Sequence, residues 1–182
     1  MSADLRALRQ SPFDLLLQFE AQLRSARLDI TAGQQQFWVG LGFRIADDWF
    51  VAPKADVREV IPPLPLTRVP GARPWLMGVA NLRGNLLPVC DLGRLLGHEH
   101  DRSGKSTRLL VFNSDRVPVG FLVDEVAGYR QFTPAEQRHE IVSGAGDYKP
   151  YLLGAFVREG QPWLAMSLHK IANSDAYNHA GW

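Results

Sequence analysis

The chain has 182 residues, of which 46% are hydrophobic and 21% are charged, so it can bury one sizeable core or two small ones that share an interface. Twenty Lys and Arg residues against nineteen Asp and Glu residues leave a formal net charge of +1, which disfavours nucleic-acid binding. No apolar run approaches the roughly 20 residues that span a bilayer, and the first ten residues lack the apolar segment of a signal peptide. We therefore expect a cytoplasmic protein with no direct membrane insertion.

The first predicted element is an amphipathic helix that begins near Ser11. Ser11 suits the N-cap, Pro12 fits the first helical position, and Asp14 suits the positive end of the helix dipole. Apolar residues then recur at three- and four-residue spacing on one face: Phe13, Leu16, Phe19, Leu23 and Ala26. We expect residues 1–35 to form a helical extension ending in a linker, and its helix to pack on the main domain; docking on a partner is the alternative.

From residue 36 the pattern changes to short strands separated by Gly, Pro, Asn and Asp. Alternating apolar residues predict a hairpin over residues 37–51 with a turn at 46–48. A second hairpin of the same kind is predicted over residues 108–123, with a turn at 113–116. The main domain is therefore expected to be mostly β, with few and short helices.

The single cysteine, Cys90, lies at the end of an apolar run and cannot form an internal disulfide. A thiol in such a run is typically a small buried hydrophobe, and we expect Cys90 to be a packing residue. A short helix is predicted directly after it, over Leu92–Leu96, with Asp91 as the N-cap and Gly97 at its end.

The chain repeats itself at an offset of 76 residues. Trp75-Leu-Met-Gly78 aligns without gaps on Tyr151-Leu-Leu-Gly154, and the same offset aligns three further pairs: Gly84 with Gly160, Leu92 with Leu168, and Arg94 with Lys170. Upstream, Val57-Arg-Glu-Val60 matches Val123-Asp-Glu-Val126. Two copies of one β-rich unit follow, each too small to bury both faces of its own sheet, so we expect two small barrels that share a core. Chance similarity between strands punctuated by glycine is the alternative.

The copies differ at one informative place. Both supply a turn glycine, but the residue before it is Arg83 in the first copy and Glu159 in the second. The fold therefore does not require arginine there. An arginine between Leu82 and Leu86 is typical of residues that anchor interfaces, and a structural ion pair with Glu59 is the alternative.

These residues carry a resemblance. The run Gly78-Val-Ala-Asn-Leu-Arg-Gly84, with Leu-Pro-Val-Cys-Asp-Leu ending at position 92, resembles the signature of the CheW-like coupling domain of bacterial chemotaxis systems. Val57-Arg-Glu-Val60 and Val119-Gly-Phe-Leu-Val-Asp-Glu-Val126 fall where that family has matching segments. The resemblance covers about residues 36–171, and the whole chain is most similar to the members that serve the twitching motility of type IV pili.

The resemblance implies a CheW-like fold, mostly β, of two five-stranded β-barrel subdomains over residues 36–172, followed by a tail at 173–182. It also implies a non-catalytic adaptor that joins the cytoplasmic tip of a methyl-accepting chemoreceptor to the regulatory domain of a CheA-like histidine kinase, at membrane receptor arrays of the cell pole. The family's receptor-contact arginine falls on Arg83 and its paired glutamate on Glu59. The neighbouring contacts fall on Val57, Val60, Val79, Leu82 and Gly84.

The residues themselves do not indicate an enzyme, and we expect no metal or cofactor. His98-Glu99-His100 has no third ligand at metal-site spacing, and adjacent carboxylates at Asp124 and Glu125 point to opposite faces of a strand. No phosphate-binding glycine loop and no Gly-x-Ser-x-Gly motif is present. A small-ligand β-barrel is the second class, and it requires an open apolar interior that we expect side chains to fill.

Overall fold

The computed structural model describes residues 37–98, 104–114, 116, 118–143 and 145–178. They belong to the second of the two units into which the chain divides, Phe37–Trp182. The expected N-terminal helix and linker lie outside the described residues.

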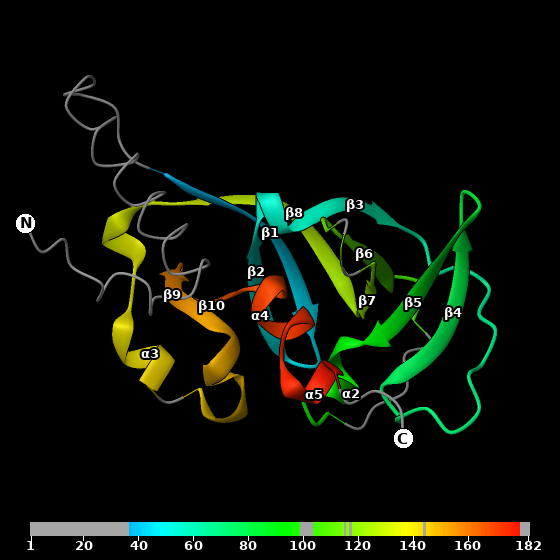
Figure 1. The fold of residues 1–182 in the computed structure, drawn as a ribbon. Helices are drawn as coiled ribbons and strands as arrows, with labels where there is room; N and C mark the ends of the chain where they lie inside the picture. The colour runs from blue at the N-terminus through cyan, green and yellow to red at the C-terminus, as the bar shows by residue number, and fades with distance from the viewer. Residues whose placement is uncertain (1–36, 99–103, 115, 117, 144, 179–182) are drawn as a thin grey trace, which may run out of the picture. The chain divides into compact units, whose positions relative to one another are not determined.

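The described residues form ten strands and several short helices (Figure 1). The strands are β1 (Trp38–Ile45), β2 (Asp48–Pro53), β3 (Val57–Ile61), β4 (Leu76–Leu82), β5 (Asn85–Asp91), β6 (Arg108–Phe112), β7 (Gly120–Val123), β8 (Glu125–Phe132), β9 (Leu152–Arg158) and β10 (Gln161–Met166). The α-helices are α2 (Leu92–Leu95), α3 (His139–Ser143), α4 (Leu168–Ala172) and α5 (Asp175–Asn178), and the 3₁₀-helices are η2 (Lys54–Asp56), η3 (Pro134–Glu136) and η4 (Gly146–Tyr151). The mostly β fold predicted from the sequence is confirmed, as are both predicted hairpins, β1–β2 and β6–β7.

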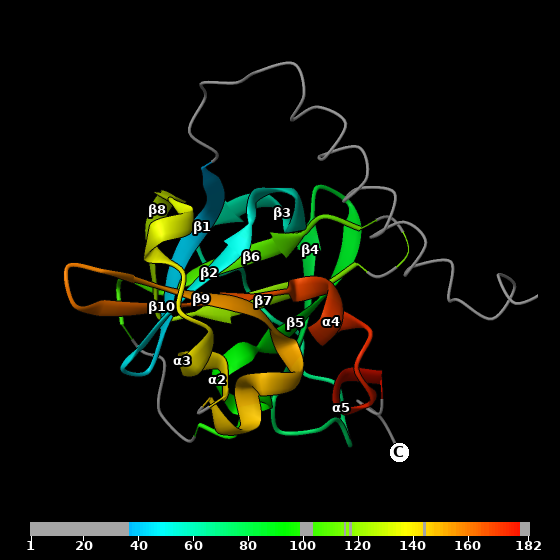
Figure 2. The same ribbon diagram turned by 90° about the vertical axis from the view of Figure 1, so that its left-hand side faces the viewer.

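The strands form two five-stranded sheets. Sheet A has the order β8-β1-β2-β10-β9, and sheet B has the order β3-β6-β7-β5-β4. Figure 1 shows the two sheets side by side, with β4 and β5 at one end and β9 at the other, and in Figure 2 sheet A lies in front of sheet B. The sheets exchange strands, because β3 follows β2 along the chain but joins sheet B, and β8 follows β7 but joins sheet A. Sheet A is therefore built from two separate parts of the sequence, β1–β2 and β8–β10, whereas sheet B is built from the continuous run β3–β7.

The backbone repeats with the same offset of 76 residues as the sequence. The Asp91 N–H donates to the Trp75 carbonyl at 2.7 Å, and the Ser167 N–H donates to the Tyr151 carbonyl at 2.9 Å. Asp91 then caps α2, and its Oδ1 accepts a hydrogen bond from the Arg94 N–H at 3.0 Å. The Ser167 hydroxyl caps α4 in the same way, from the Lys170 N–H at 3.2 Å. The two copies are thus β1 to α2 and β6 to α4.

The segment that follows each exchanged strand brings the two edges of a sheet together. After β3, Thr67 pairs with Val79 of β4, and after β8, Gln137 pairs with Phe156 of β9. Since β3 and β4 are the two edges of sheet B, and β8 and β9 those of sheet A, each isolated bridge spans the open side of its sheet. Each sheet therefore curls toward a barrel, which limits the unpaired edge that it exposes.

Three apolar clusters fill the domain. The largest lies between the sheets and includes Phe43, Phe50, Phe112, Phe121 and Met166. The interior of sheet B is aliphatic, with buried residues Ala80, Leu87, Val89, Leu109, Val111 and Leu122. The interior of sheet A is largely aromatic, with buried residues Val51, Phe132, Phe156, Trp163 and Ala165. Side chains thus occupy both barrel interiors, which removes the open cavity that a small-ligand barrel requires.

Cys90, which the sequence predicts to be a packing residue, is 0% exposed and lies in the cluster between the sheets. Residues after 172 contribute as well, because Tyr177 of α5 stacks on Trp75 with ring centroids 5.6 Å apart. Burial raises the pKa of Tyr177 to about 12, so its hydroxyl is uncharged at neutral pH.

A buried carboxylate joins the two copies. Asp56 of η2 is 5% exposed, and its Oδ2 accepts a hydrogen bond from the Leu168 N–H of α4 at 3.0 Å. His169 Nε2 lies 3.6 Å from Asp56 Oδ1. Burial raises the pKa of Asp56, while His169 opposes that shift. The pair fixes the start of α4 against the loop before β3.

Candidate partner-binding site

The β4–β5 turn places Arg83 at the tip of a tight hairpin. Arg83 and Gly84 both have positive φ, at 53° and 88°, and the Gly84 N–H donates to Asn81 Oδ1 at 2.8 Å. Glycine adopts this backbone without strain, whereas a residue with a Cβ is disfavoured in it. The equivalent turn of the second copy has the same backbone, with Glu159 at 51° and Gly160 at 78°. The turn therefore needs its glycine but does not need arginine.

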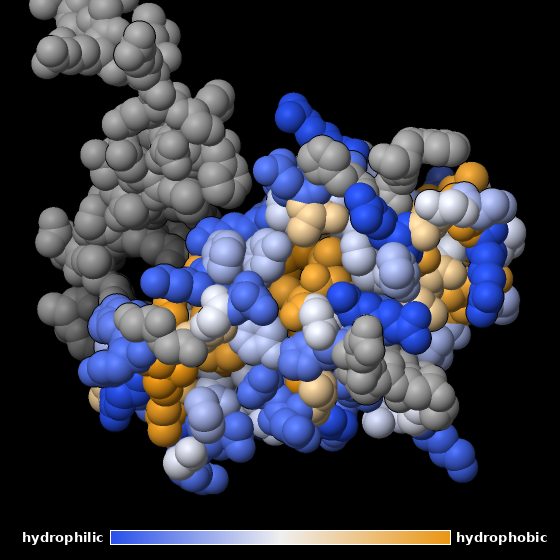
Figure 3. Space-filling model, turned by 90° about the horizontal axis from the view of Figure 1, so that it is seen from below, coloured by the Kyte–Doolittle hydropathy of each residue, from blue (hydrophilic) through white to orange (hydrophobic). Residues whose placement is uncertain are grey.

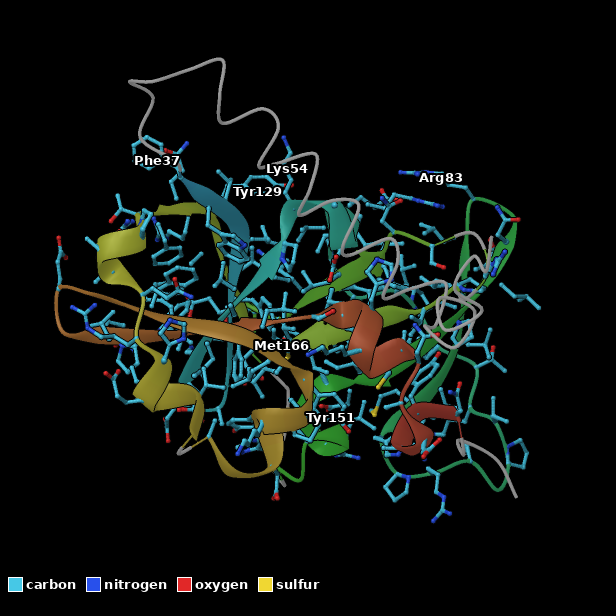
Figure 4. The ribbon with its side chains drawn as sticks, turned by 60° about the vertical axis from the view of Figure 1, so that its left-hand side comes forward. Phe37, Lys54, Arg83, Tyr129, Tyr151 and Met166 are labelled. Carbon is cyan, nitrogen blue, oxygen red and sulfur yellow. The ribbon has the colours of Figure 1, made fainter. Side chains whose placement is uncertain are left out.

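Glu59 holds the Arg83 side chain through two parallel contacts. Nη1 donates to Oε1 at 2.9 Å and Nη2 donates to Oε2 at 2.7 Å. The Arg83 side chain is 73% exposed and that of Glu59 is 21% exposed, so the pair adds under about 1 kcal/mol to stability. Its bidentate geometry nevertheless fixes the direction of the guanidinium. Figure 4 shows Arg83 at the far end of the hairpin, with its side chain at the surface.

The second copy also has an arginine–glutamate ion pair, but its arginine lies on a strand and not at the turn. Arg158 of β9 contacts Glu136 of η3 at 2.7 and 3.1 Å and also donates to the Gln131 carbonyl. Its guanidinium lies over the Phe132 ring, 4.7 Å from the centroid. The Arg158 side-chain hydrogen bond, followed by that of the Thr133 N–H, lowers the pKa of Glu136 to about 2. This pair belongs to the wall of barrel A, whereas Arg83 lies at a turn.

The residues expected to surround Arg83 do not all lie at the surface. Val57 is 7% exposed and belongs to the cluster between the sheets, so it is not available to a partner in this conformation. Val60 is half-buried against the same cluster, and Leu82 is half-buried against the interior of sheet B. Val79 is half-buried on β4, opposite Pro88 of β5. Gly84, Arg83 and Glu59 are the predicted residues that the structure brings together at the turn.

Leu86 is a surface residue that was not among the expected contacts. It is 73% exposed and lies opposite Asn81 on the outer face of the β4–β5 hairpin, two residues after Gly84. The neighbouring Ala80 and Leu87 point inward and are 1% and 4% exposed. In the view from below, apolar side chains gather in separate patches, one of them at the end where β4 and β5 lie (Figure 3). Leu86 therefore leaves an uncovered apolar side chain on the outer face of the hairpin whose turn carries Arg83.

A second exposed cluster was also not expected from the sequence. Tyr129 of β8 is 54% exposed, and Lys54 Nζ lies 5.6 Å from the centroid of its ring. Phe37, just before β1, is 49% exposed. Figure 4 shows these three residues along the same edge of the view as Arg83. Aromatic side chains are enriched at protein interfaces relative to the rest of a surface, whereas lysine is depleted there.

The acidic and histidine motifs have structural partners. Asp124 Oδ2 accepts a hydrogen bond from the Ala46 N–H at 2.6 Å, and Glu125 pairs with Arg44 at 3.1 Å, so both carboxylates hold the β1–β2 hairpin. His98 contacts the Tyr148 hydroxyl, and the rest of the His98-Glu99-His100 motif lies outside the described residues. Among the residues that the structure describes, no three His, Cys, Asp or Glu side chains group as metal ligands do. No helix in this part of the chain combines the length and apolarity needed to cross a bilayer.

Comparisons with known proteins agree with this geometry. The profile of the CheW-like domain matches residues 39–176. The chain is 37% identical to the protein PilI of Pseudomonas aeruginosa over 170 residues, which cover 92% of this chain and 95% of PilI. It is 29% identical to the chemotaxis protein CheW of Thermotoga maritima over 131 residues, or 72% of this chain and 85% of that one.

A solved structure shares the fold. The crystal structure of the scaffolding protein TtCheW from Thermoanaerobacter tengcongensis superimposes with a TM-score of 0.64 at 18% sequence identity, and the match covers 78% of this chain and 96% of TtCheW. At that identity the likeness shows the two-sheet fold alone. With the profile match and the similarity to PilI over nearly the whole chain, it shows that this chain belongs to the CheW-like domain family.

Proposed function

We propose that the protein is a non-catalytic adaptor that couples the cytoplasmic tip of a methyl-accepting chemoreceptor to the regulatory domain of a CheA-like histidine kinase, in a system that controls type IV pilus twitching motility. Its place is in the cytoplasm, at receptor arrays of the cell pole. Membership of the CheW-like family supports the adaptor role, and the similarity to PilI over 92% of the chain supports the assignment to a pilus system.

The observation that carries the proposal is the oriented Arg83 at the β4–β5 turn. The turn would be less strained with glycine at that position, and the second copy shows that glutamate also fits. Arginine thus occupies a position where the fold does not need it, with Glu59 directing its guanidinium and Leu86 exposed on the same hairpin. An arginine anchor beside exposed apolar surface has the composition of an interface hot spot.

An adaptor of this kind performs no bond chemistry. It fixes the distance and angle between two partners, so that a conformational bias in the receptor alters the population of active kinase. The two sheets offer two unlike surfaces for this purpose. The turn of sheet B carries Arg83, while the matching turn of sheet A carries Glu159. We assign the Arg83 turn to the receptor, with Val60, Val79 and Leu82 supporting it from below rather than forming its outer surface.

The decisive experiment measures binding of each partner separately. Purified receptor-tip and kinase regulatory fragments are titrated into the full-length protein and into the Arg83→Glu and Glu159→Arg variants. The two substitutions are matched, because both reverse a charge at the same position of the same turn type. The proposal predicts that Arg83→Glu weakens receptor binding and that Glu159→Arg does not. Failure of the wild-type protein to bind either fragment would remove the adaptor assignment altogether.

A further inference from the structure

A cleft lies at one end of sheet A, away from the β4–β5 turn. Its volume is about 350 Å³, at the lower end of the range for small-molecule pockets, roughly 300–1,000 Å³. It is bounded by the start of β2, by Ile141 of α3, by Ala145 and the start of η4, and by the start of β10. Figure 1 shows α3 at the lower left and the β4–β5 turn at the upper right. The lining residues are Asp48, Trp49, Ile141, Ala145, Gly146, Tyr148, Gln161, Pro162 and Leu164.

The walls of this cleft include apolar side chains, and Asp48 and Gln161 offer hydrogen-bond acceptors in it. Ile141, Leu164 and Pro162 supply aliphatic surface. Gln161 Nε2 donates to the carbonyl of Pro162 at 3.0 Å, which leaves the Gln161 amide oxygen without a hydrogen-bond donor among the described residues. No basic side chain is among the described residues that line the cleft. Its chemistry therefore suits a group that brings hydrogen-bond donors and positive charge.

Asp48 supplies the charged acceptor. The Tyr148 hydroxyl donates to Asp48 Oδ2 at 3.0 Å, while Oδ1 accepts no hydrogen bond and forms no ion pair within the described part of the chain. Asp47 in the same turn and Asp147 beside Tyr148 add negative charge nearby, against one lysine in η4, Lys149. Arg44, which lies over the Trp49 ring, is already paired with Glu125. The exposed oxygen of Asp48 is thus open to an incoming cation.

Tyr148 holds this carboxylate in place. Its ring stacks on His98 with centroids 5.7 Å apart and packs edge-on against Phe50 at 5.2 Å. His98 Nε2 also contacts its hydroxyl. Burial, followed by the hydrogen bond to Asp48, raises the pKa of Tyr148, so the hydroxyl remains protonated and continues to donate. A carboxylate that is oriented before binding loses little freedom when it binds a cation.

We propose that this cleft binds an alkyl cation, meaning a guanidinium or primary ammonium group carried on a short aliphatic chain. The cationic head pairs with Asp48 Oδ1 and donates to the Gln161 amide oxygen, and the chain packs on Ile141 and Leu164. Guanidinium suits the site best, because its planar donors can reach two acceptors at once. The same chemistry comes either from a free small amine or from an arginine side chain of a partner protein. The proposal does not depend on the adaptor function.

The test uses butylguanidinium as the probe and its neutral analogue butylurea as the control. Nuclear magnetic resonance of the ¹⁵N-labelled full-length protein follows the Trp49 indole N–H during titration. We expect a saturable shift with butylguanidinium that weakens at least about tenfold in Asp48→Asn, because a hydrogen bond to a charged group is lost. The asparagine still accepts the Tyr148 hydroxyl, so the turn should keep its fold. Asp47→Asn removes the same charge from the neighbouring position, which is not in the lining, and should change affinity less than about twofold.

A second arm distinguishes the two sources of the cation. If Asp48→Asn weakens binding of the receptor or kinase fragment, and butylguanidinium competes with that fragment, the cation is a partner's arginine. If fragment binding is unchanged while the probe still binds, the cation is a free small amine. The proposal is overturned if butylguanidinium gives no saturable shift, if butylurea binds equally well, or if Asp48→Asn and Asp47→Asn behave alike.

Discussion

Arg83 and Glu59 lie on opposite edges of one five-stranded sheet, yet their side chains meet at 2.7 and 2.9 Å. The contact exists because sheet B curls until the segment after β3 reaches β4, where Thr67 and Val79 exchange hydrogen bonds at 2.9 and 2.8 Å. The ion pair therefore depends on the closure of the barrel, and it also fixes the direction of the Arg83 guanidinium. Mutation can separate the contribution of this pair to stability from its contribution to partner binding.

Arg83→Glu should leave the fold intact and weaken receptor association by about 2 kcal/mol or more, as truncation of an interface anchor does. The measurement is isothermal titration calorimetry with a receptor-tip fragment, accompanied by a thermal melt of the variant alone. The charge swap Arg83→Glu with Glu59→Arg refines the test. Recovery of receptor affinity in the swap would mean that the pair acts structurally; continued loss would mean that the guanidinium itself contacts the receptor. Receptor affinity that is unaltered in Arg83→Glu contradicts the assignment.

Leu86→Ser should change the free energy of unfolding by no more than about 0.5 kcal/mol, because the side chain is 73% exposed and supports no core. It should still weaken partner binding if Leu86 lies in the interface. The matched control is Leu153→Ser, which removes a 50%-exposed leucine from β9 in the second copy. Surface plasmon resonance with the receptor fragment compares the two variants. Equal effects of both substitutions would show that the β4–β5 hairpin has no special role.

The stabilisation from Glu136 should depend on pH in the acid range. Because the folded-state pKa of about 2 is below the ordinary value of 4.5, the ionised carboxylate stabilises the folded state above pH 4.5. That stabilisation is lost as the pH falls toward 2. Urea unfolding of wild type and Glu136→Gln at pH 7, 5 and 3 should therefore show a stability difference that shrinks below pH 4.5. Glu140→Gln, an exposed carboxylate on α3, is the control. A difference that stays constant from pH 7 to pH 3 would be inconsistent with the Arg158 contact.

Cys90→Ala should cost roughly 1 kcal/mol of unfolding free energy, since it removes one fully buried sulfur from the cluster between the sheets. Partner binding should survive, because Cys90 lies inside the domain. The native thiol should react slowly with a thiol reagent and become reactive only when the protein is unfolded in urea. Rapid labelling of the native protein would show that the cluster opens more readily than its packing indicates.

The sequence predicted the repeat and the turn because each depends on local or periodic features, whereas the Arg83–Glu59 pair was the alternative to an interface role and came otherwise from the family resemblance. The offset of 76 residues, the paired glycines and the capping residue Asp91 all have direct backbone consequences. The inward position of Val57 was not predictable in this way. A β-bulge between Val57 and Glu59 interrupts the alternation of β3, so Val57, which a regular strand would place on the same face as Glu59, packs into the cluster between the sheets.

Leu86 and Asp56 were missed for two further reasons. Leu86 and Leu87 are adjacent and equally apolar, so composition does not tell which faces inward; the pairing of Leu86 with Asn81 decides it. Asp56 is buried because it meets α4, 112 residues further along the chain. Contacts over such a separation depend on the exchange of strands between the sheets, which no local pattern encodes.

That exchange makes the two halves inseparable. Each copy contributes a hairpin to one sheet and three strands to the other. A chain ending before β8 would therefore lack three of the five strands of sheet A and would keep only β1 and β2 there. A shortened protein carrying only the Arg83 half is therefore expected to dimerise through its unpaired strands or to aggregate. Substitutions that test the proposed receptor and kinase contacts separately must therefore be made at the surface, because both halves belong to one compact unit.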